Sequence, residues 1–326
     1  MAATISPEHI LKELAQLWAS EGQEVLRACT MTLVVVTEQD DDRQELGETL
    51  AALMPEHPAR TLIVRLTGPG DSALAERVYQ QCWMPFGQRR QVCCEQVEIS
   101  ATDGALSDLP SVILPLAVAD LPVFLWARSP RMFGTPGFDA LAQLADKEII
   151  ESGRMDPADA VVRMQRRLAR GPVLGDLSWT RLTRWRNMFA QIFENRERLA
   201  RLTGVRRILV RHSGERPNTS AILMACWVRD AVGGSAEMTF EKGEWPGAGR
   251  APLVLSIGLE GEGINVELRR DQDRMITTID GASQCTNLPM ATPYLLMREE
   301  LGITRRDPVF ERTLASAARL LYSEGK

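Results

Sequence analysis

The sequence predicts an α/β protein with an N-terminal, mainly parallel α/β sheet domain, a helical connector and a C-terminal α+β domain that contains an antiparallel β-meander. Three observations predict this class. Strand-like and helix-like patterns alternate at first, which is typical of parallel sheets. Helical periodicity then dominates the connector, and short apolar runs separated by tight turns follow it. The predicted domains are residues 1–150, 151–203 and 204–326.

The N-terminal domain is expected to begin with a helix, because Ser6 can cap it and Pro7 suits its first turn. The run from 31 to 36, Met-Thr-Leu-Val-Val-Val, is apolar enough to be a strand buried on both faces. The further elements expected in order are a helix over 46–53, a strand over 61–66, a helix over 72–83, and strands over 91–99 and 123–126.

The connector helix is expected to begin at Asp156-Pro157 and to end at Gly171-Pro172. A second connector helix carries an apolar stripe through Leu182, Trp185, Phe189 and Ile192. The elements expected in the C-terminal domain are a strand over 208–210, a helix over 218–232, strands over 253–259, 264–268 and 275–279, and helices over 293–301 and 308–322. Turns at 260–263 and 271–273 separate the consecutive strands of the meander.

Composition excludes several classes of protein. The 326 residues are 44% hydrophobic and 25% charged, which is typical of a globular chain and not of a disordered, collagenous or coiled-coil one. The net charge of -5 argues against nucleic acid as a partner. No apolar run reaches the roughly 20 residues of a membrane helix, and the start lacks a signal-peptide pattern. We therefore expect a cytoplasmic protein without a membrane partner.

The basic residues are unevenly distributed. Only four of the 38 basic residues are lysines, and residues 154 to 211 hold 14 arginines against 5 acidic residues. A genome rich in G and C explains the number of arginines without any function. The alternative is a recognition surface, because a basic segment in an acidic chain can meet an acidic partner or an anionic ligand.

Cysteines and catalytic motifs give little sign of chemistry. The six cysteines are expected to be free thiols, and the adjacent Cys93 and Cys94 are either structural or a redox switch. The run Asp40-Asp41-Asp42 is expected to be a solvated helix start, with a cation site as the alternative. The sequence contains no dinucleotide-binding glycine motif, no Walker motif for phosphate and no nucleophile-elbow motif. The sequence therefore predicts no catalytic residues, no metal and no cofactor.

A segment rich in tryptophan and arginine is the most distinctive stretch of the chain. Trp179 and Trp185 are interleaved with Arg181, Arg184 and Arg186. Tryptophan and arginine are enriched at the hot spots of protein interfaces. A helix that packs its tryptophans into the core and leaves its arginines outside would give the same pattern, so residue types alone leave both interpretations open.

The same segment resembles a family signature. Residues 176–186, D-L-S-W-T-R-L-T-R-W-R, resemble the D-L-x-W-T-R-L-T-P-W-R motif of the OpcA family of glucose-6-phosphate dehydrogenase assembly proteins. Residues 114–126, L-P-L-A-V-A-D-L-P-V-F-L-W, resemble a second motif of that family, and residues 57–60, H-P-A-R, are similar to its H-P-S-R. Arg184 and Ala119 stand where the family usually has proline.

The resemblance implies a non-catalytic protein that binds glucose-6-phosphate dehydrogenase, promotes its active oligomer and raises its affinity for sugar phosphate in the pentose phosphate pathway. Such a protein can change an enzyme's rate only by binding its active state more tightly. The resemblance also implies possible thioredoxin-linked redox control, which we assign to no particular cysteine. We therefore expect an assembly factor and allosteric activator of carbohydrate metabolism.

We expect the partner-binding residues to lie on the tryptophan–arginine segment, the preceding helix and the H-P-x-R motif. They are Trp179, Thr180, Arg181, Trp185, Arg186, Arg163, Arg166, Arg167 and Arg60. Two other functions stay open. A sugar-phosphate or nucleotide-binding α/β enzyme requires convergent titratable residues in one pocket. A metabolite sensor requires saturable binding of a small molecule without the dehydrogenase.

Overall fold

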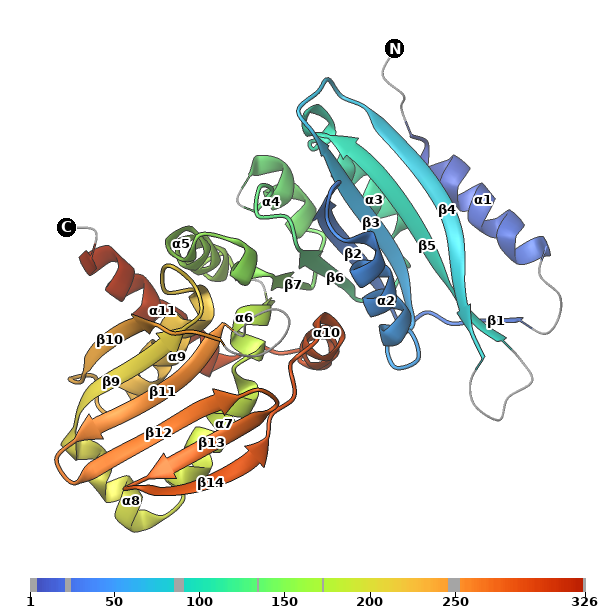
Figure 1. Ribbon diagram of the computed structural model, residues 1–326. Coiled ribbons are helices and arrows are strands. Elements are labelled where there is room, and N and C mark those ends of the chain that lie inside the picture. The colour runs from blue at the N-terminus through green and yellow to red at the C-terminus, as the bar shows by residue number, and fades with distance from the viewer. Residues whose placement is uncertain are drawn as a thin grey trace. The chain divides into compact units, whose positions relative to one another are not determined.

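The computed structural model (Figure 1) describes residues 5–20, 25–84, 91–133, 135–171, 173–245 and 253–324. The chain forms two compact units. The first unit comprises Met1–Arg154, Pro172–Gly175 and Pro293–Arg305, and the second comprises Met155–Gly171, Asp176–Thr292 and Arg306–Lys326. Of the predicted connector 151–203, residues 155–171 and 176–203 fall in the second unit, and residues 151–154 and 172–175 fall in the first.

The first unit is built on an eight-stranded sheet, sheet A, whose path is β1-β5-β3-β2-β6-β7-β8, with β4 paired to β5. Its strands are β1 (Val25–Arg27), β2 (Met31–Glu38), β3 (Ala59–Gly68), β4 (Leu74–Trp83), β5 (Gln91–Thr102), β6 (Val123–Ala127), β7 (Lys147–Ile150) and β8 (Val173–Asp176). Its helices are α1 (Pro7–Ser20), α2 (Arg43–Leu53), α3 (Leu109–Leu116), α4 (Pro136–Ala142), α10 (Pro293–Gly302) and the short η1 (Asp103–Ala105) and η2 (Ser152–Arg154).

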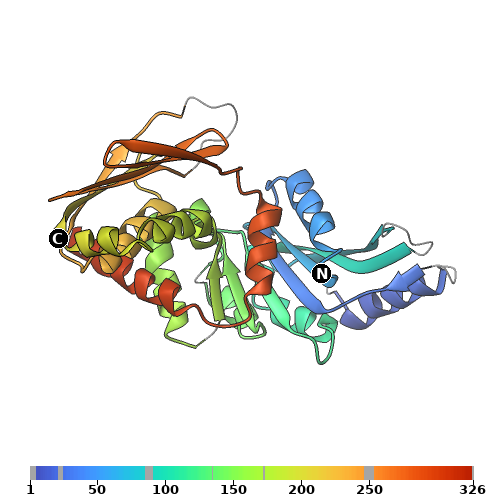
Figure 2. The same cartoon turned by 90° about the horizontal axis from the view of Figure 1, so that it is seen from below.

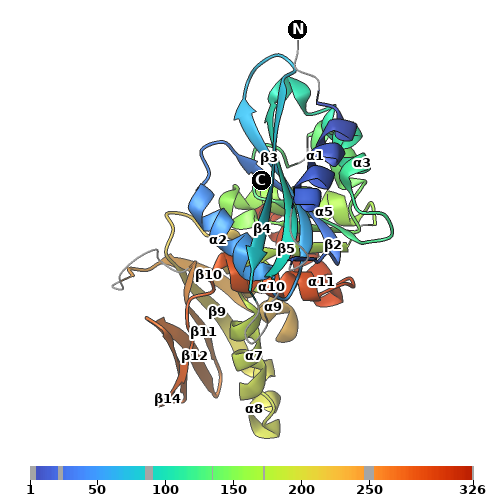
Figure 3. The ribbon, with the colours of Figure 1, turned by 90° about the vertical axis from the view of Figure 1, so that its right-hand side faces the viewer.

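Sheet A has the topology of a doubly wound fold. The path β5-β3-β2-β6-β7-β8 is the strand order 3-2-1-4-5-6, with β2 as the first strand. The pairs β2–β3, β2–β6, β3–β5 and β6–β7 are all parallel. Figure 3 shows α2 on one face of the sheet and α1 and α3 on the other. Because both faces are covered, Met31 to Thr37 of β2 are all buried, which confirms the predicted buried strand.

One predicted element is wrong. The stretch 72–83 is predicted as a helix, but residues 74–83 form β4, which pairs antiparallel with β5 without interruption from Leu74 to Trp83. Ten consecutive cross-strand pairs outweigh local propensity, and Val78, Tyr79 and Trp83 suit a strand.

Helix α10 belongs to the first unit although it lies near the end of the chain. The ammonium Nζ of Lys147, on β7, donates to the carboxylate of Glu300 at 2.6 Å and to the carbonyl of Ile303 at 2.8 Å. At the surface, Tyr294 and Arg298 both donate to the carboxylate of Glu56. The buried ion pair and its carbonyl partner fix the register of α10 on sheet A.

The second unit is built on a six-stranded sheet, sheet B, in the order β10-β9-β11-β12-β13-β14. Its strands are β9 (Val205–His212), β10 (Glu237–Lys242), β11 (Val254–Gly261), β12 (Ile264–Asp271), β13 (Arg274–Ile279) and β14 (Ala282–Asn287). Its helices are α5 (Pro157–Leu168), α6 (Leu177–Thr180), α7 (Thr183–Ile192), α8 (Arg196–Arg201), η3 (Leu202–Gly204), α9 (Thr219–Ala231) and α11 (Pro308–Glu324).

The pairing in sheet B confirms the predicted meander. Strands β9 and β10 pair in parallel, whereas β11 to β14 pair antiparallel in sequence order. Figure 2 shows the helices of this unit on one side of sheet B. Helix α9, buried along most of its length, packs on β9, β10 and β11 from that side. The other side of the sheet carries exposed and half-buried polar residues, as the alternation along β12 requires.

The expectation of free thiols is wrong for two of the six cysteines. Cys82 on β4 and Cys93 on β5 lie directly opposite each other and form a disulfide, with 4.0 Å between their Cα atoms. Cys94 points to the other face of the sheet, where burial raises its pKa to about 11. Cys94 is therefore a neutral thiol at neutral pH and a weak nucleophile.

Candidate functional site

The tryptophan–arginine segment lies largely in the core of the second unit. Trp179 is 3% exposed and Trp185 is 4% exposed, so both rings are buried within the chain. The indole N–H of Trp179 donates to a carboxylate oxygen of Asp307 at 2.9 Å, and its ring packs on Phe310. The guanidinium of Arg186 lies 3.6 Å from the centroid of the same ring. The segment therefore joins α6 and α7 to the start of α11.

Asp307 explains why this contact is well defined. Its other carboxylate oxygen accepts hydrogen bonds from the backbone N–H groups of Val309 and Phe310, so Asp307 caps α11 while it holds Trp179. At the start of the segment, Asp176 is fully buried and its carboxylate accepts the backbone N–H of Trp179. The conspicuous motif thus specifies internal packing.

The other predicted partner-binding residues are divided between core and surface. Thr180 and Arg167 are buried in the second unit, and Arg181 donates to the carbonyl of Ala291. Arg60 is buried in the first unit, where it donates to Glu95 at 2.6 Å. Trp179, Trp185, Thr180, Arg167 and Arg60 are thus buried within the chain, and their role in partner binding stays a prediction, as it does for Arg181 and Arg186.

Two further predicted arginines lie on α5. Arg166 is exposed on α5, and Arg163 is half-buried one turn earlier, where it pairs with Asp159 at 3.4 Å. Their binding role stays a prediction.

The carboxyl edge of sheet A is the place where a doubly wound fold usually binds a ligand. In such folds the crevice forms between the two central strands at which the strand order reverses, here β2 and β6. The segments that leave these strands begin at Gln39 and at Arg128. What these segments carry decides which ligand the edge can accept.

A buried network of charges fills this edge. Arg128 is 1% exposed, and its guanidinium lies 3.0 Å from Asp41, 3.4 Å from Glu45 and 3.6 Å from Glu151. Arg154 bridges two of the same carboxylates, at 2.8 Å from Asp41 and 3.0 Å from Glu151. The network thus ties the segment after β2 to the segments after β6 and β7. Its charged groups are paired with one another.

A second cluster continues the network along the edge. Arg131 lies 2.8 Å from Glu38, the last residue of β2, and 2.5 Å from Asp103, which follows β5. The hydroxyl of Ser129 donates to Glu38 as well. The ends of three parallel strands are therefore cross-linked by side chains of this chain alone.

The first helix after β2 does not fit a dinucleotide. A pyrophosphate group requires a glycine-rich turn and uncapped N–H groups at this helix start. Here the turn holds no glycine, and the carboxylate of Asp42 accepts the N–H groups of Gln44 and Glu45 at 2.9 and 3.0 Å. The neighbouring Asp40 and Asp41 would also repel a phosphate. The residues present do not fit NAD or NADP at this edge.

The charge state of the network follows from its contacts. Burial on its own would raise the pKa of Asp41, but hydrogen bonds from Thr37 and Arg154 and the charge of Arg128 outweigh it and lower that pKa. Asp41 is therefore a carboxylate at neutral pH. The acidic run is thus only partly the expected solvated helix start, because Asp42 caps α2 while Asp41 is buried in an ion-pair network.

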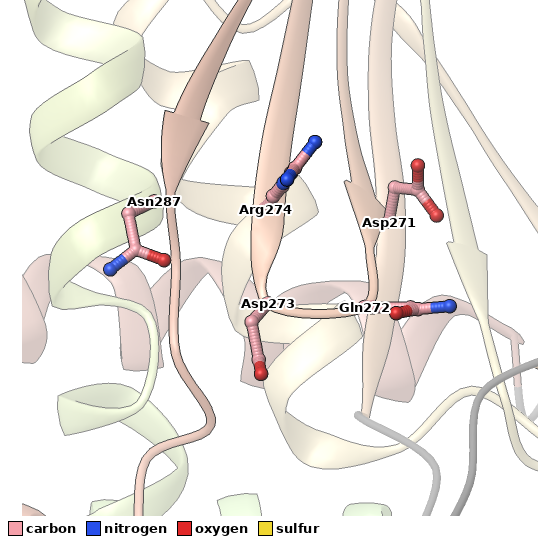
Figure 4. A pocket seen from close by; sticks show the side chains of 5 residues that line it. All are labelled: Asp271, Gln272, Asp273, Arg274 and Asn287. Carbon is pink, nitrogen blue, oxygen red and sulfur yellow. The ribbon is translucent and has the colours of Figure 1, made fainter.

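Charged and polar side chains line two hollows of the second unit. One, of 430 Å³, lies at the turn between β12 and β13, and Figure 4 shows the five polar side chains that line it. The other, of 370 Å³, includes Arg211, Lys242, Arg269 and Arg270. Arg211 already pairs with Glu241 and Glu267, Lys242 pairs with Glu215, and Arg270 donates to the carbonyl of Leu288. Most of its positive charge is therefore neutralised within the protein.

Among the residues that the structure describes, no group of three or more histidine, cysteine or acidic side chains is placed to hold a metal ion. None of the described helices combines the length and apolarity needed to cross a bilayer.

His212 provides a test of how the second unit is packed. It is the last residue of β9 and is 2% exposed. Burial lowers its pKa and outweighs a hydrogen bond with the backbone of Gly214, which would raise that pKa. The unfolded chain, with a histidine pKa of about 6.5, therefore takes up a proton first as the pH falls. We predict that the free energy of unfolding decreases from about pH 7 to pH 5 and that His212→Gln reduces this slope. Urea unfolding at a series of pH values measures this slope.

His57→Gln, at a half-buried site in the other unit, is the control. An unchanged slope in His212→Gln would contradict the prediction.

Family models place both halves of the chain. Residues 51–166 match the model of the glucose-6-phosphate dehydrogenase subunit N-terminal domain, and residues 172–314 match the model of the C-terminal domain of the same subunit. Together these matches cover most of the chain and meet close to the boundary between the two units.

Individual relatives agree with this placement, and one solved structure shares the fold. An OxPP cycle protein named OpcA from Nostoc punctiforme is 28% identical over 138 residues, which are 42% of this chain and 30% of that protein. Its namesake from Synechococcus elongatus is 22% identical over 280 residues, 84% of this chain and 57% of that protein. The matched part of this chain thus spans between about a third and a little over half of the length of these relatives. A 3-ketoreductase from Actinomadura kijaniata, solved with NADP, aligns over 90% of this chain and 96% of its own with a TM-score of 0.50 and 8% identity, which is a likeness of fold alone. Two domain models in the right order and these relatives place the chain in the OpcA family of glucose-6-phosphate dehydrogenase subunits.

Proposed function

We propose that this chain is a non-catalytic subunit that assembles with glucose-6-phosphate dehydrogenase in the cytoplasm and activates it allosterically in the oxidative pentose phosphate pathway. Family membership supports the partner. The observation that carries the non-catalytic part is the charge network at the carboxyl edge of sheet A, where Arg128 pairs with three carboxylates of its own chain.

The network favours a binding protein over an enzyme for a physical reason. Catalytic acids and bases must face a substrate and exchange protons with it. The carboxylates gathered at this edge are paired with arginines of the same chain. A fold of this kind offers its partner a surface, and it changes the partner's rate by binding its active state more tightly; about 1.4 kcal/mol of preference shifts that equilibrium tenfold.

The experiment combines the purified chain with glucose-6-phosphate dehydrogenase from the same organism. We expect a complex in light scattering, together with a lower KM for glucose 6-phosphate or a higher kcat, under reducing or oxidising conditions. We also expect the chain alone to leave NADPH fluorescence unchanged. The absence of both a complex and a kinetic effect would refute the assembly proposal. Saturable NADPH binding would favour the alternative of a nucleotide-binding enzyme.

The exposed arginines of α5 give a variant for the same assay. We predict that Arg166→Glu weakens the complex by about threefold or more without changing the thermal stability of the free chain, because reversing a charge at an interface changes affinity and not folding. Arg196→Glu, an equally exposed arginine at the start of α8, is the matched control. Equal affinities for both variants would remove α5 from the candidate interface.

A further inference from the structure

Strand β14 is an unprotected edge of sheet B. All six of its residues are exposed, and its sequence Ala-Ser-Gln-Cys-Thr-Asn contains neither charge nor proline. It pairs with β13 in six consecutive register positions without a bulge. Proteins usually protect such edges with charges, prolines or bulges, because the free backbone groups pair readily with another strand. The opposite edge, β10, does carry Glu237, Glu241 and Lys242.

The register identifies the free backbone groups. Asp280 and Gly281, both with positive φ, form a two-residue turn, so the flanking pair Ile279–Ala282 is hydrogen-bonded. Hydrogen-bonded and non-hydrogen-bonded pairs alternate along an antiparallel ladder. The N–H and C=O groups of Ser283, Cys285 and Asn287 therefore point away from β13. Within the part of the chain that the structure describes, no hydrogen bond reaches these groups.

We infer that β14 pairs antiparallel with β14 of a second copy of this chain, about a two-fold axis at Cys285. In this register Cys285 lies opposite its own equivalent, and Ser283 lies opposite Asn287 of the second copy. All six free groups of each strand then find a partner, and the two six-stranded sheets become one. Such an interface is isologous, because the same strand serves both copies. The inference goes beyond the proposed function and does not depend on it.

The side chains beside the axis suit a second copy. Cys285 pairs with Ile276 on β13 and shares its face of the sheet, so the axis brings together two isoleucines and two cysteines. The hydroxyls of Thr278 and Ser283, 2.9 Å apart, make the next pair. Figure 4 shows Asn287 with Arg274 and Asp271 on successive strands. The nearest charges are therefore one and two strands away from the edge, and no like charges meet across the axis.

The area involved limits the affinity. Two six-residue strands bury less surface than the roughly 1,200 Å² of a stable interface, so the edge alone supports a weak dimer that forms with increasing concentration.

The test uses the full chain and needs no dehydrogenase. Sedimentation velocity over a concentration series is expected to show a reversible dimer. The Cα atoms of the two Cys285 residues would lie about 5.5 Å apart, so a short bis-maleimide is expected to cross-link the wild type and not Cys285→Ser. Ser283→Pro removes an outward N–H that β13 does not use, and Cys285→Lys places two like charges at the axis. Each is expected to raise the dimer Kd about tenfold or more.

The controls separate pairing from folding. Ser283→Ala keeps the backbone N–H and should leave the Kd of the dimer within about twofold of the wild-type value. Circular dichroism and thermal unfolding check that every variant is folded. If Ser283→Pro is not folded, Cys285→Lys alone provides the test. A monomer at every concentration, or a dimer that neither variant weakens, would overturn the inference. The inference would also be overturned if the chain were a monomer and Ser283→Pro weakened its binding to the dehydrogenase, since the edge would then bind a strand of the enzyme.

Discussion

Arg128→Ala is expected to lower the free energy of unfolding by about 3–5 kcal/mol, a large fraction of the stability of a protein of this size. The substitution leaves the buried carboxylate of Asp41 with Arg154 as its remaining cationic partner at this edge. It also removes a guanidinium that lies 4.9 Å from the centroid of the Trp126 ring. An uncompensated buried charge costs more than the lost contacts themselves. Urea unfolding at neutral pH measures the change.

A second variant shows whether charge or packing causes the loss. Arg128→Met combined with Asp41→Asn removes both charges and keeps most of the volume, so we expect it to regain most of the lost stability. Arg131→Ala, at a half-exposed position of the same edge, is the control and should cost about 1 kcal/mol or less. A loss of under about 1 kcal/mol in Arg128→Ala would mean that Arg154 and water are enough to compensate the charge of Asp41 without Arg128.

The sequence predicts the central strands well because their signal is local. A short apolar run rich in β-branched residues favours a strand covered on both faces, and β2 is one. The meander was predictable because polar turns separate its apolar runs. Residues 260–263 contain two glycines, and residues 271–273 contain two aspartates. Strand β4 was not, because its pairing with β5 outweighs a composition that favours a helix.

The candidate sites depend on partners that are distant in sequence. Arg128 and Asp41 look like ordinary surface residues in the sequence, and only the strand order brings them together at one edge. The acceptor for the Trp179 indole lies 128 residues further along the chain. Residue types and spacing left the role of Trp179 evenly open, because an interface tryptophan and a core tryptophan next to arginines have the same local pattern.

Trp179→Ala is expected to destabilise the second unit by about 3–5 kcal/mol. The loss combines the cavity left by a buried indole, the ring contact with Phe310, and the stacked guanidinium of Arg186. Trp179→Phe keeps most of the packing and loses the hydrogen bond to Asp307, so it should cost about 1–3 kcal/mol. Thermal and urea unfolding of the three proteins measure this order.

The same variants separate a structural from a binding role of the motif. If the motif is a scaffold, Trp179→Phe binds glucose-6-phosphate dehydrogenase with wild-type affinity wherever it is folded, and Trp179→Ala loses binding only in proportion to its unfolded fraction. Asp307→Asn keeps one acceptor oxygen for the helix cap but turns the acceptor of the indole N–H into an NH2 donor, so it should be destabilised like Trp179→Phe and bind with wild-type affinity wherever it is folded. A folded Trp179→Phe variant with at least about tenfold weaker binding would instead place the ring at the interface, and α6 would have to open when the partner binds.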